Sequence, residues 1–139
     1  MKKEKKLTPS LPSGFLDYKG NTLELKKNII KIIEDNFINF GYSALEQSIF
    51  EITENIGSFL ADDPTNPMAD VYSFEDGREQ LTYRYDMTAG LARMYAANYL
   101  ELPSIYKRYC IGDVARREKP QKKIRLKSFT QADCDIIGN

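Results

Sequence analysis

The chain has 139 residues, 42% of them hydrophobic and 29% charged, which suits one globular domain with a core of its own. The absence of histidine, and the presence of only two cysteines without a C-x-x-C spacing, argue against a transition-metal site and against a disulfide-rich secreted fold. The formal net charge is zero, yet nine Lys and Arg stand against two acids between residues 107 and 127, which suggests a local anion site rather than a uniformly basic surface.

Residues 1–20 are rich in Lys, Pro, Ser and Gly, so we expect a flexible leader. This leader lacks the apolar run of a signal peptide, and no later stretch approaches the ~20 apolar residues of a membrane span. We therefore expect a cytoplasmic protein without a membrane partner, in which Cys110 and Cys134 are reduced thiols.

Residues 22–40 have the pattern of an amphipathic helix. Asn21 can cap the first turn, Glu24 stands where it can reach back to the cap, and Gly41 follows as a stop signal. Apolar residues recur at steps of three and four, which predicts one apolar face made of Leu25, Ile29, Ile32, Ile33, Phe37 and Phe40.

The next part of the chain mixes turns and short strands. Residues 42–53 suggest a short strand and a turn, and residues 61–70 are predicted to form a loop by their Pro, Asn and Asp content. Residues 71–76 and 81–86 have the pattern of two strands that form a hairpin around Gly77.

A second helix is predicted over residues 88–100. Pro103 ends it, and one side is formed by Leu91, Met94, Tyr95 and Asn98. Two strands follow at 105–115 and 124–137, separated by a polar turn at 117–123. The predicted fold class is α+β, with an antiparallel sheet flanked by helices.

Side chains of a strand alternate between its two faces, so the last strand presents two different surfaces. One is small or apolar and is predicted to pack against a helix layer: Ile124, Leu126, Ser128, Thr130, Ala132, Cys134 and Ile136. The other combines cations, a ring, an amide and carboxylates: Arg125, Lys127, Phe129, Gln131, Asp133 and Asp135.

The polar face has two interpretations. Any half-exposed sheet has a polar solvated side, and on that view Arg108 and Arg117, in the preceding strand and turn, are solvated cations as well. Phe129 and Gln131 fit a solvated side less well. The order of cation, ring, amide and carboxylate would suit a ligand with phosphates, a flat base and a cationic amine.

The sequence VARREKPQ at 114–121, followed by RLKSFTQADCDIIG at 125–138, resembles motif 2 of class II aminoacyl-tRNA synthetases, and most of all that of histidyl-tRNA synthetases. LTYRYDMTAGLAR at 81–93 is similar to the segment before motif 2, and FINFGYSALEQSIFE resembles motif 1. The resemblance covers nearly the whole chain. It implies that residues 21–139 are the N-terminal portion of a class II catalytic domain, with motifs 1 and 2 only.

The resemblance implies an ATP site. Arg116 matches the catalytic arginine that contacts the α-phosphate, and Glu118 matches the acid that holds the adenosine end. Arg125 matches an arginine that binds the ATP phosphates, and Phe129 matches the ring that stacks on adenine.

The resemblance also implies a site for histidine. Gln131 and Asp135 match contacts to the substrate, and a carboxylate at the second position would pair with its α-ammonium. Asp86 and Thr88 match a further acid and hydroxyl of this site. From the residues alone, either of these two could equally be the N-cap of the second helix.

Activity and partners follow from the same resemblance. ATP with Mg²⁺ would activate histidine, the acyl group would pass to tRNA, and the intact protein is expected to be a homodimer. Ser48 stands where motif 1 usually has a proline, and Gly90 replaces the family's proline after Thr88-Ala89. Because the sequence contains no motif 3 or anticodon-binding domain, we expect a truncated chain that is poorly stable and has no adenylation activity alone.

Two alternatives stay open. Histidine-sensing regulatory subunits of ATP phosphoribosyltransferase resemble synthetases in fold, although Arg116, Glu118 and Phe129 favour a protein that uses ATP. A nucleic-acid-binding module would use the basic hairpin and would lose affinity steeply with salt, but it has no need for a row of ring, amide and carboxylate.

Overall fold

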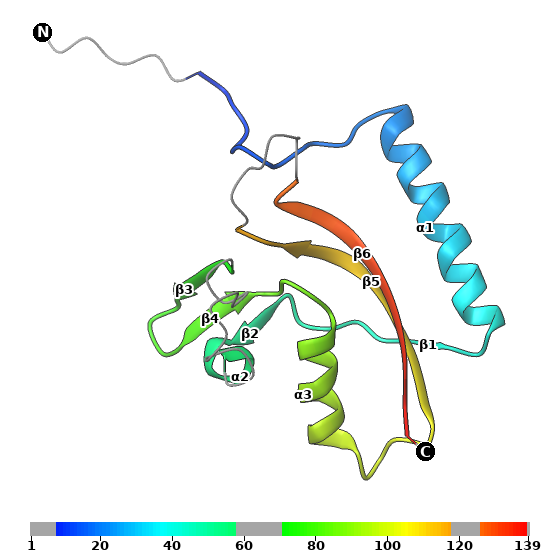
Figure 1. The fold of residues 1–139 in the computed structure, drawn as a ribbon. Coiled ribbons are helices and arrows are strands. Elements are labelled where there is room, and N and C mark those ends of the chain that lie inside the picture. Colours follow the sequence, from blue (N-terminus) through cyan, green and yellow to red (C-terminus); the bar gives the residue numbers. More distant parts are fainter. Residues whose placement is uncertain (1–7, 58–70, 118–125, 139) are drawn as a thin grey trace, which may run out of the picture.

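The computed structural model describes residues 8–57, 71–117 and 126–138, which form stacked layers (Figure 1). A long two-stranded arm lies in the middle, with α1 on one side and α3 beside a small second sheet on the other. The fold is α+β, as predicted, and its elements are α1 (Asn21–Asn39), β1 (Ser43–Ala44), β2 (Phe50–Ile52), α2 (Thr53–Gly57), β3 (Ser73–Glu75), β4 (Gln80–Tyr83), α3 (Thr88–Asn98), β5 (Tyr106–Ala115) and β6 (Ser128–Ile137).

Strands β5 and β6 form the long antiparallel pair that the sequence predicted. All ten residues of each strand are in register, from Tyr106 opposite Ile137 to Ala115 opposite Ser128. Most of the predicted turn, together with the first two residues of the predicted last strand, lies in 118–125, outside the described residues.

The remaining strands depart from a single antiparallel sheet. β1 joins β5 in parallel, with Ser43 opposite Arg108. The sheet that contains β5 and β6 is therefore mixed, and the prediction of a purely antiparallel sheet is wrong on this point. Strands β2, β4 and β3 form a separate antiparallel sheet. The hairpin predicted around Gly77 is present as β3 and β4: Gly77 has a φ of 92°, and the Asp76 carboxylate accepts the backbone N–H of Arg78 at 3.0 Å.

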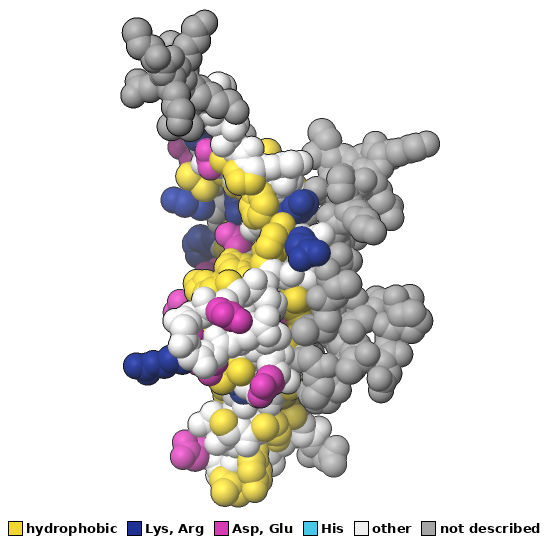
Figure 2. Space-filling view, turned by 90° about the vertical axis from the view of Figure 1, so that its left-hand side faces the viewer, with side chains coloured by type: hydrophobic (Ala, Val, Ile, Leu, Met, Phe, Trp, Pro, Cys, Tyr) yellow, Lys and Arg dark blue, Asp and Glu magenta, His cyan; other side chains and the backbone are white. Residues whose placement is uncertain are grey.

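The outer side of the small sheet is aromatic. The ring of Phe50 meets the rings of Phe74 and Tyr83 edge-on, at centroid distances of 5.2 and 5.7 Å. Figure 2 views the molecule from the left-hand side of Figure 1 and shows patches of hydrophobic side chains between polar and charged ones.

Helix α1 begins and ends one residue earlier than predicted, and it is capped differently. Gly20, with a φ of 55°, is the N-cap, and no side chain caps this end, so the predicted reciprocal capping by Asn21 and Glu24 is wrong. The reason is that Asn21 is already helical, and the Glu24 amide donates to the Gly20 carbonyl at 3.1 Å. Gly41 ends the helix as predicted, with a φ of 77°.

The predicted apolar face of α1 is only partly buried. Only one line of the predicted face is half-buried. Ile33 and Phe37 belong to this line, and the ring of Phe37 lies 5.4 Å from that of Tyr109 in β5. The other predicted members are exposed, namely Leu25, Ile29, Ile32 and Phe40.

The centre of the core lies on the opposite side of β5 and β6. Met87, Cys110 and Val114 are almost completely buried, and Phe129 packs against them. The polar face of β6 is therefore turned toward this core, whereas the apolar face lies on the side of α1, the helix layer that the sequence predicted for it. A hollow of about 400 Å³ lies between α1 and that apolar face and is lined there by Thr130 and Ala132. Ala132, Cys134 and Ile136 are exposed.

Helix α3 ends two residues before the predicted Leu100. Leu91 is buried and Met94 and Tyr95 are half-buried, as predicted, whereas Asn98 is exposed and donates from its side chain to the Met94 carbonyl at 2.7 Å. None of the helices that the structure describes is long and apolar enough to cross a membrane.

The described part of the leader, residues 8–20, contains no helix or strand, as expected. It is nevertheless attached to the domain at two points. The carbonyl of Gly14 accepts the Lys127 amide at 2.8 Å, and the Phe15 ring lies 6.3 Å from that of Tyr72.

Candidate active site

The inward face of β6 combines a ring, an amide and two carboxylates. These side chains are Phe129, Gln131, Asp133 and Asp135, which share a face as the alternation predicted. Their partners across the ladder are the β5 residues Val114, Gly112, Cys110 and Arg108. Arg125, predicted to share this face, and Glu118, predicted to lie near it, are both outside the described residues.

Arg116 lies beside Phe129 at one end of this face. Its Nε donates to the Tyr85 carbonyl at 3.1 Å, and its guanidinium carbon lies 5.3 Å from the centre of the Phe129 ring. The Arg116 amide donates to the Lys127 carbonyl at 2.8 Å, which continues the pairing beyond Ala115. A cation held in this way next to an aromatic face suits a ligand that combines a phosphate with a flat base.

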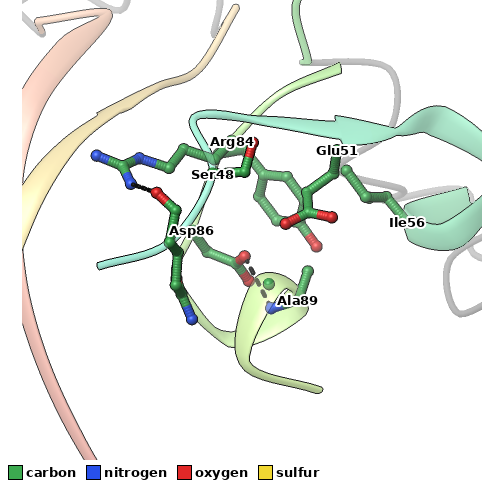
Figure 3. Close-up of a pocket in the computed structure, with 9 residues that line it drawn as sticks. Ser48, Glu51, Ile56, Arg84, Asp86 and Ala89 are labelled. Carbon is green, nitrogen blue, oxygen red and sulfur yellow. Dashed lines mark hydrogen bonds between the residues drawn. The ribbon is translucent and has the colours of Figure 1, made fainter. Parts of the chain in front are cut away.

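Asp86 lies at the start of α3, and Figure 3 shows its carboxylate directed toward the first turn of that helix. Oδ1 accepts the Ala89 amide at 3.2 Å, so Asp86 does act as a cap. Burial raises the pKa of Asp86 and the charge of Asp133 raises it further, whereas the Ala89 amide and the guanidinium of Arg116 lower it. The pKa of Asp86 therefore depends on the charges of both Asp133 in β6 and Arg116. Thr88 is exposed on the first turn of α3.

Two hollows border Asp86. The one drawn in Figure 3, between Glu51, Arg84 and Ala89, is too narrow for a water molecule. The other is a groove of about 710 Å³ along α3, lined by Asn55, Ile56, Tyr85, Asp86, Thr88, Ala89, Ala92, Arg93, Ala96 and Ala97. This groove has the size of a small-molecule site, and it adjoins two of the residues predicted to bind histidine.

Asp135 is engaged in an ion pair. Its Oδ2 lies 2.6 Å from Nη2 of Arg108, which also donates to the Met87 carbonyl at 3.2 Å. Arg108 has no exposed surface, so the expectation of a solvated cation is wrong for this residue and correct for Arg117, which is exposed. Arg108 occupies an inward position of β5, on the same face as the buried Cys110, a pattern that could have marked it as a buried charge.

The residues that join the segments around the site, Arg84 and Gln47, are not marked by any pattern in the sequence. Arg84 donates from Nε to the Asp113 carbonyl at 2.8 Å and from Nη1 to the Gln47 carbonyl at 3.2 Å. The buried side chain of Gln47 donates in turn to the Met87 carbonyl at 3.1 Å. These bonds join segments far apart in the sequence, and no local pattern predicts them.

No cluster of three or more His, Cys, Asp or Glu suited to a metal ion occurs in the part of the chain that the structure describes. The arrangement therefore provides an anchored cation, an aromatic face and carboxylates around the start of α3. It resembles a site for an anionic nucleotide joined to a cationic group.

Comparison with solved structures defines the class of fold. The structure is similar to an ATP phosphoribosyltransferase regulatory subunit/histidyl-tRNA synthetase from Bacillus halodurans, with a TM-score of 0.78 and 23% identity over 97% of this chain and 34% of that one. A histidyl-tRNA synthetase from Nostoc sp. PCC 7120 gives a TM-score of 0.77 and 24% identity over 94% and 29% of the two chains. The fold is that of synthetase-type catalytic domains.

Sequence comparison identifies the family. Residues 14–139 match the family description "Histidyl-tRNA synthetase". The histidine–tRNA ligase of Pelagibacter ubique is 58% identical over 139 residues, and that of Bartonella bacilliformis is 42% identical over 139 residues. The chain belongs to the histidyl-tRNA synthetase family. These matches cover 100% and 99% of the chain, which spans only 30% and 28% of those relatives.

Proposed function

We propose that the chain forms the ATP- and histidine-binding part of a histidine–tRNA ligase. The observation that carries this proposal is the position of the Arg116 guanidinium over the ring of Phe129. The carboxylate of Asp86, just before α3, is affected by the charges of Arg116 and of Asp133 on the same face of β6. Membership of the family, and the identity with named ligases over the whole chain, support it.

In the proposed site, Phe129 stacks on adenine and Arg116 contacts the α-phosphate. The guanidinium is held by the Tyr85 carbonyl, so it is already oriented when negative charge grows on the phosphate during attack by the histidine carboxylate. Glu118 and Arg125 would contact the adenosine and the phosphates, and both lie outside the described residues.

Histidine would lie farther along β6, next to the start of α3. Gln131 and Asp135 from the strand, with Asp86 and Thr88 from the helix, are the residues proposed to bind it. We include in the proposal that ATP is used with Mg²⁺, that tRNA receives the acyl group, and that the complete protein is a homodimer. Without a metal cluster in the described residues, no metal ligand is assigned to this chain.

A hybrid enzyme tests the proposal, with this chain in place of the matching segment of the Pelagibacter ubique ligase. The hybrid should catalyse histidine-dependent exchange of pyrophosphate into ATP. Arg116→Ala should lower the exchange rate at least 100-fold, the effect of removing a preorganised charge at a transition state. Arg117→Ala is the matched control and should have little effect, because Arg117 is exposed. A folded but inactive hybrid, or equal losses in the two variants, would contradict the proposal.

A second candidate is a histidine-sensing regulatory subunit. The observation in its favour is the structural similarity to the ATP phosphoribosyltransferase regulatory subunit/histidyl-tRNA synthetase from Bacillus halodurans. The two functions differ in the use of ATP. A regulatory protein would bind histidine without catalysing pyrophosphate exchange, and Phe129→Leu would leave its affinity for histidine unchanged.

A further inference from the structure

A short turn at residues 12–15 is the part of the leader that meets the rest of the domain. Within residues 8–20, Gly14 and Phe15 are half-buried and all the others are exposed. The Phe15 amide closes the turn by donating to the Pro12 carbonyl at 3.2 Å, and Gly14 occupies the third position with a φ of 89°. A type II turn needs glycine at this position, so the residues Pro-Ser-Gly-Phe themselves specify the turn.

This turn holds Lys127 by its backbone. The Gly14 carbonyl accepts the Lys127 amide at 2.8 Å, and the Lys127 carbonyl accepts the Arg116 amide at 2.8 Å. Lys127 therefore lies between the leader and Arg116, with both of its backbone polar groups engaged. The backbone of Arg116 is thus supported by a residue that the leader fixes in turn.

The side chain of Arg116 has a second support, at the end of the small sheet. Its Nε donates to the carbonyl of Tyr85, which follows β4 by two residues. The leader reaches this sheet as well, because the Phe15 ring packs near that of Tyr72, whose carbonyl accepts the Tyr83 amide at 2.8 Å. The leader therefore connects the two supports of the arginine, its backbone partner and the small sheet.

The approach of the leader to Lys127 leaves no room for a side chain at Gly14. A Cβ atom there would lie 2.7 Å from Cγ and 3.2 Å from Cβ of Lys127. Both atoms are close to the Lys127 backbone, so the contact cannot be relieved by turning the end of the side chain alone. A shift of the Lys127 backbone would pass to Arg116 through the hydrogen bond between them, and misplacement of a catalytic group by ~1 Å can lower a rate about 100-fold.

We propose that Gly14 is a positioning residue for the adenylation step. Through Lys127 it fixes the backbone of Arg116, so that the guanidinium is directed at the α-phosphate. This inference rests on the proposed function, and it extends the active site to the leader, which lies outside the predicted catalytic domain of residues 21–139.

The hybrid enzyme provides the test, through kcat for pyrophosphate exchange and the KM for histidine. Gly14→Ala should lower kcat about tenfold and change the KM for histidine less than about twofold, because Arg116 is proposed to act on the phosphate in the transition state. Each variant is assayed below the onset of its thermal unfolding, so that loss of folded enzyme does not contribute.

Gly77→Ala is the matched control. Gly77 has a φ of 92°, so alanine there meets nearly the same backbone strain, but no atom of the described residues lies within 4 Å of the added methyl group. This variant should keep kcat within about twofold of the unmodified hybrid, since strain in a distant hairpin does not reach Arg116.

Two double variants separate positioning from a general loss of structure. In an Arg116→Ala background, Gly14→Ala should lower kcat by less than a further factor of about two, because the group that it positions is absent. In a Lys127→Ala background, its effect should be smaller than about tenfold, because alanine keeps both backbone hydrogen bonds and lacks the Cγ that the methyl group meets.

Three results would overturn the inference and leave the proposed function in place. These are an unchanged kcat in Gly14→Ala, an equal loss in Gly77→Ala, and the same proportional loss with and without Arg116. Inactivity of the unmodified hybrid would instead contradict the proposed function, and this inference with it.

Discussion

Arg93 in α3 clamps Glu51 in β2 with two hydrogen bonds, from Nε to Oε2 at 2.6 Å and from Nη2 to Oε1 at 3.0 Å. Glu51 is only 6% exposed, so this pair fixes α3 against the small sheet. Bidentate pairs of this kind combine strength with fixed geometry.

Arg93→Ala should destabilise the chain by about 3 kcal/mol, because it leaves the buried Glu51 carboxylate without its partner. Urea denaturation measures this change. The double variant Glu51→Gln/Arg93→Met should recover part of the loss, since it leaves no buried charge. Equal losses in the single and double variants would show that the charge pairing is not the cause.

Gly112→Ala should destabilise the chain by about 1–3 kcal/mol through overpacking. A methyl group at Gly112 would collide with Nη2 of Arg84 and would lie 3.3 Å from Cε of Met87. Arg84 would have to release the Asp113 and Gln47 carbonyls. A double-mutant cycle with Arg84→Ala checks this cause, because the effect of the new methyl group should be smaller once the guanidinium is absent.

Phe129→Leu should raise the KM for ATP about tenfold in the hybrid enzyme, because base stacking on an aromatic ring contributes about 1–3 kcal/mol. Leucine retains apolar packing against Met87, Cys110 and Val114, so thermal stability should change little. Histidine KM is the internal control and should stay near its original value. An unchanged KM for ATP would remove Phe129 from the proposed adenine site.

Asp86→Asn should change the pH dependence of stability in a defined direction. The pKa of Asp86 is raised above its ordinary value of 3.8, mainly by burial. At pH values between the ordinary pKa and the raised pKa, Asp86 is protonated in the folded chain and ionised in the unfolded chain. The free energy of unfolding therefore falls as the pH rises through this range. Asparagine caps a helix about as well as aspartate, and it has no charge to bury.

The stability of Asp86→Asn relative to the unmodified chain should therefore increase from pH 4 upward and become constant above the raised pKa. Urea denaturation at several pH values measures this difference. A relative stability that declines with rising pH would mean that the folded structure favours the ionised carboxylate.

Local patterns in the sequence predicted the elements that have strong local signals. The 3.6-residue period gave α1 and α3, and Gly41 and Gly77 marked a helix end and a hairpin turn through their positive φ values. The two-residue period placed Phe129, Gln131 and Asp135 on one face, because side-chain alternation in a regular strand depends on no distant contact.

The features that the sequence analysis missed depend on partners far away in the chain. Strand alternation marks Arg108 as inward, but its burial results from packing against the Met87 segment and pairing with Asp135. Four of the six predicted members of the apolar face of α1 are exposed, and two of them, Leu25 and Ile29, line the hollow between the helix and the sheet, which no local pattern predicts. Asp133 lies on the predicted face, and none of the ion pairs in the described part of the chain includes it, which no local pattern predicts.

The hydrogen bond between the Gly14 carbonyl and the Lys127 amide closes a loop of more than a hundred residues. Closing so long a loop is entropically costly, so this contact should form late in folding, after the strands are paired. Gly14→Ala, which would place a methyl group 2.7 Å from Cγ of Lys127, should therefore accelerate unfolding in stopped-flow experiments and leave the refolding rate almost unchanged. On this prediction, the contact between Gly14 and Lys127 limits the rate of unfolding and therefore determines how long the folded state persists.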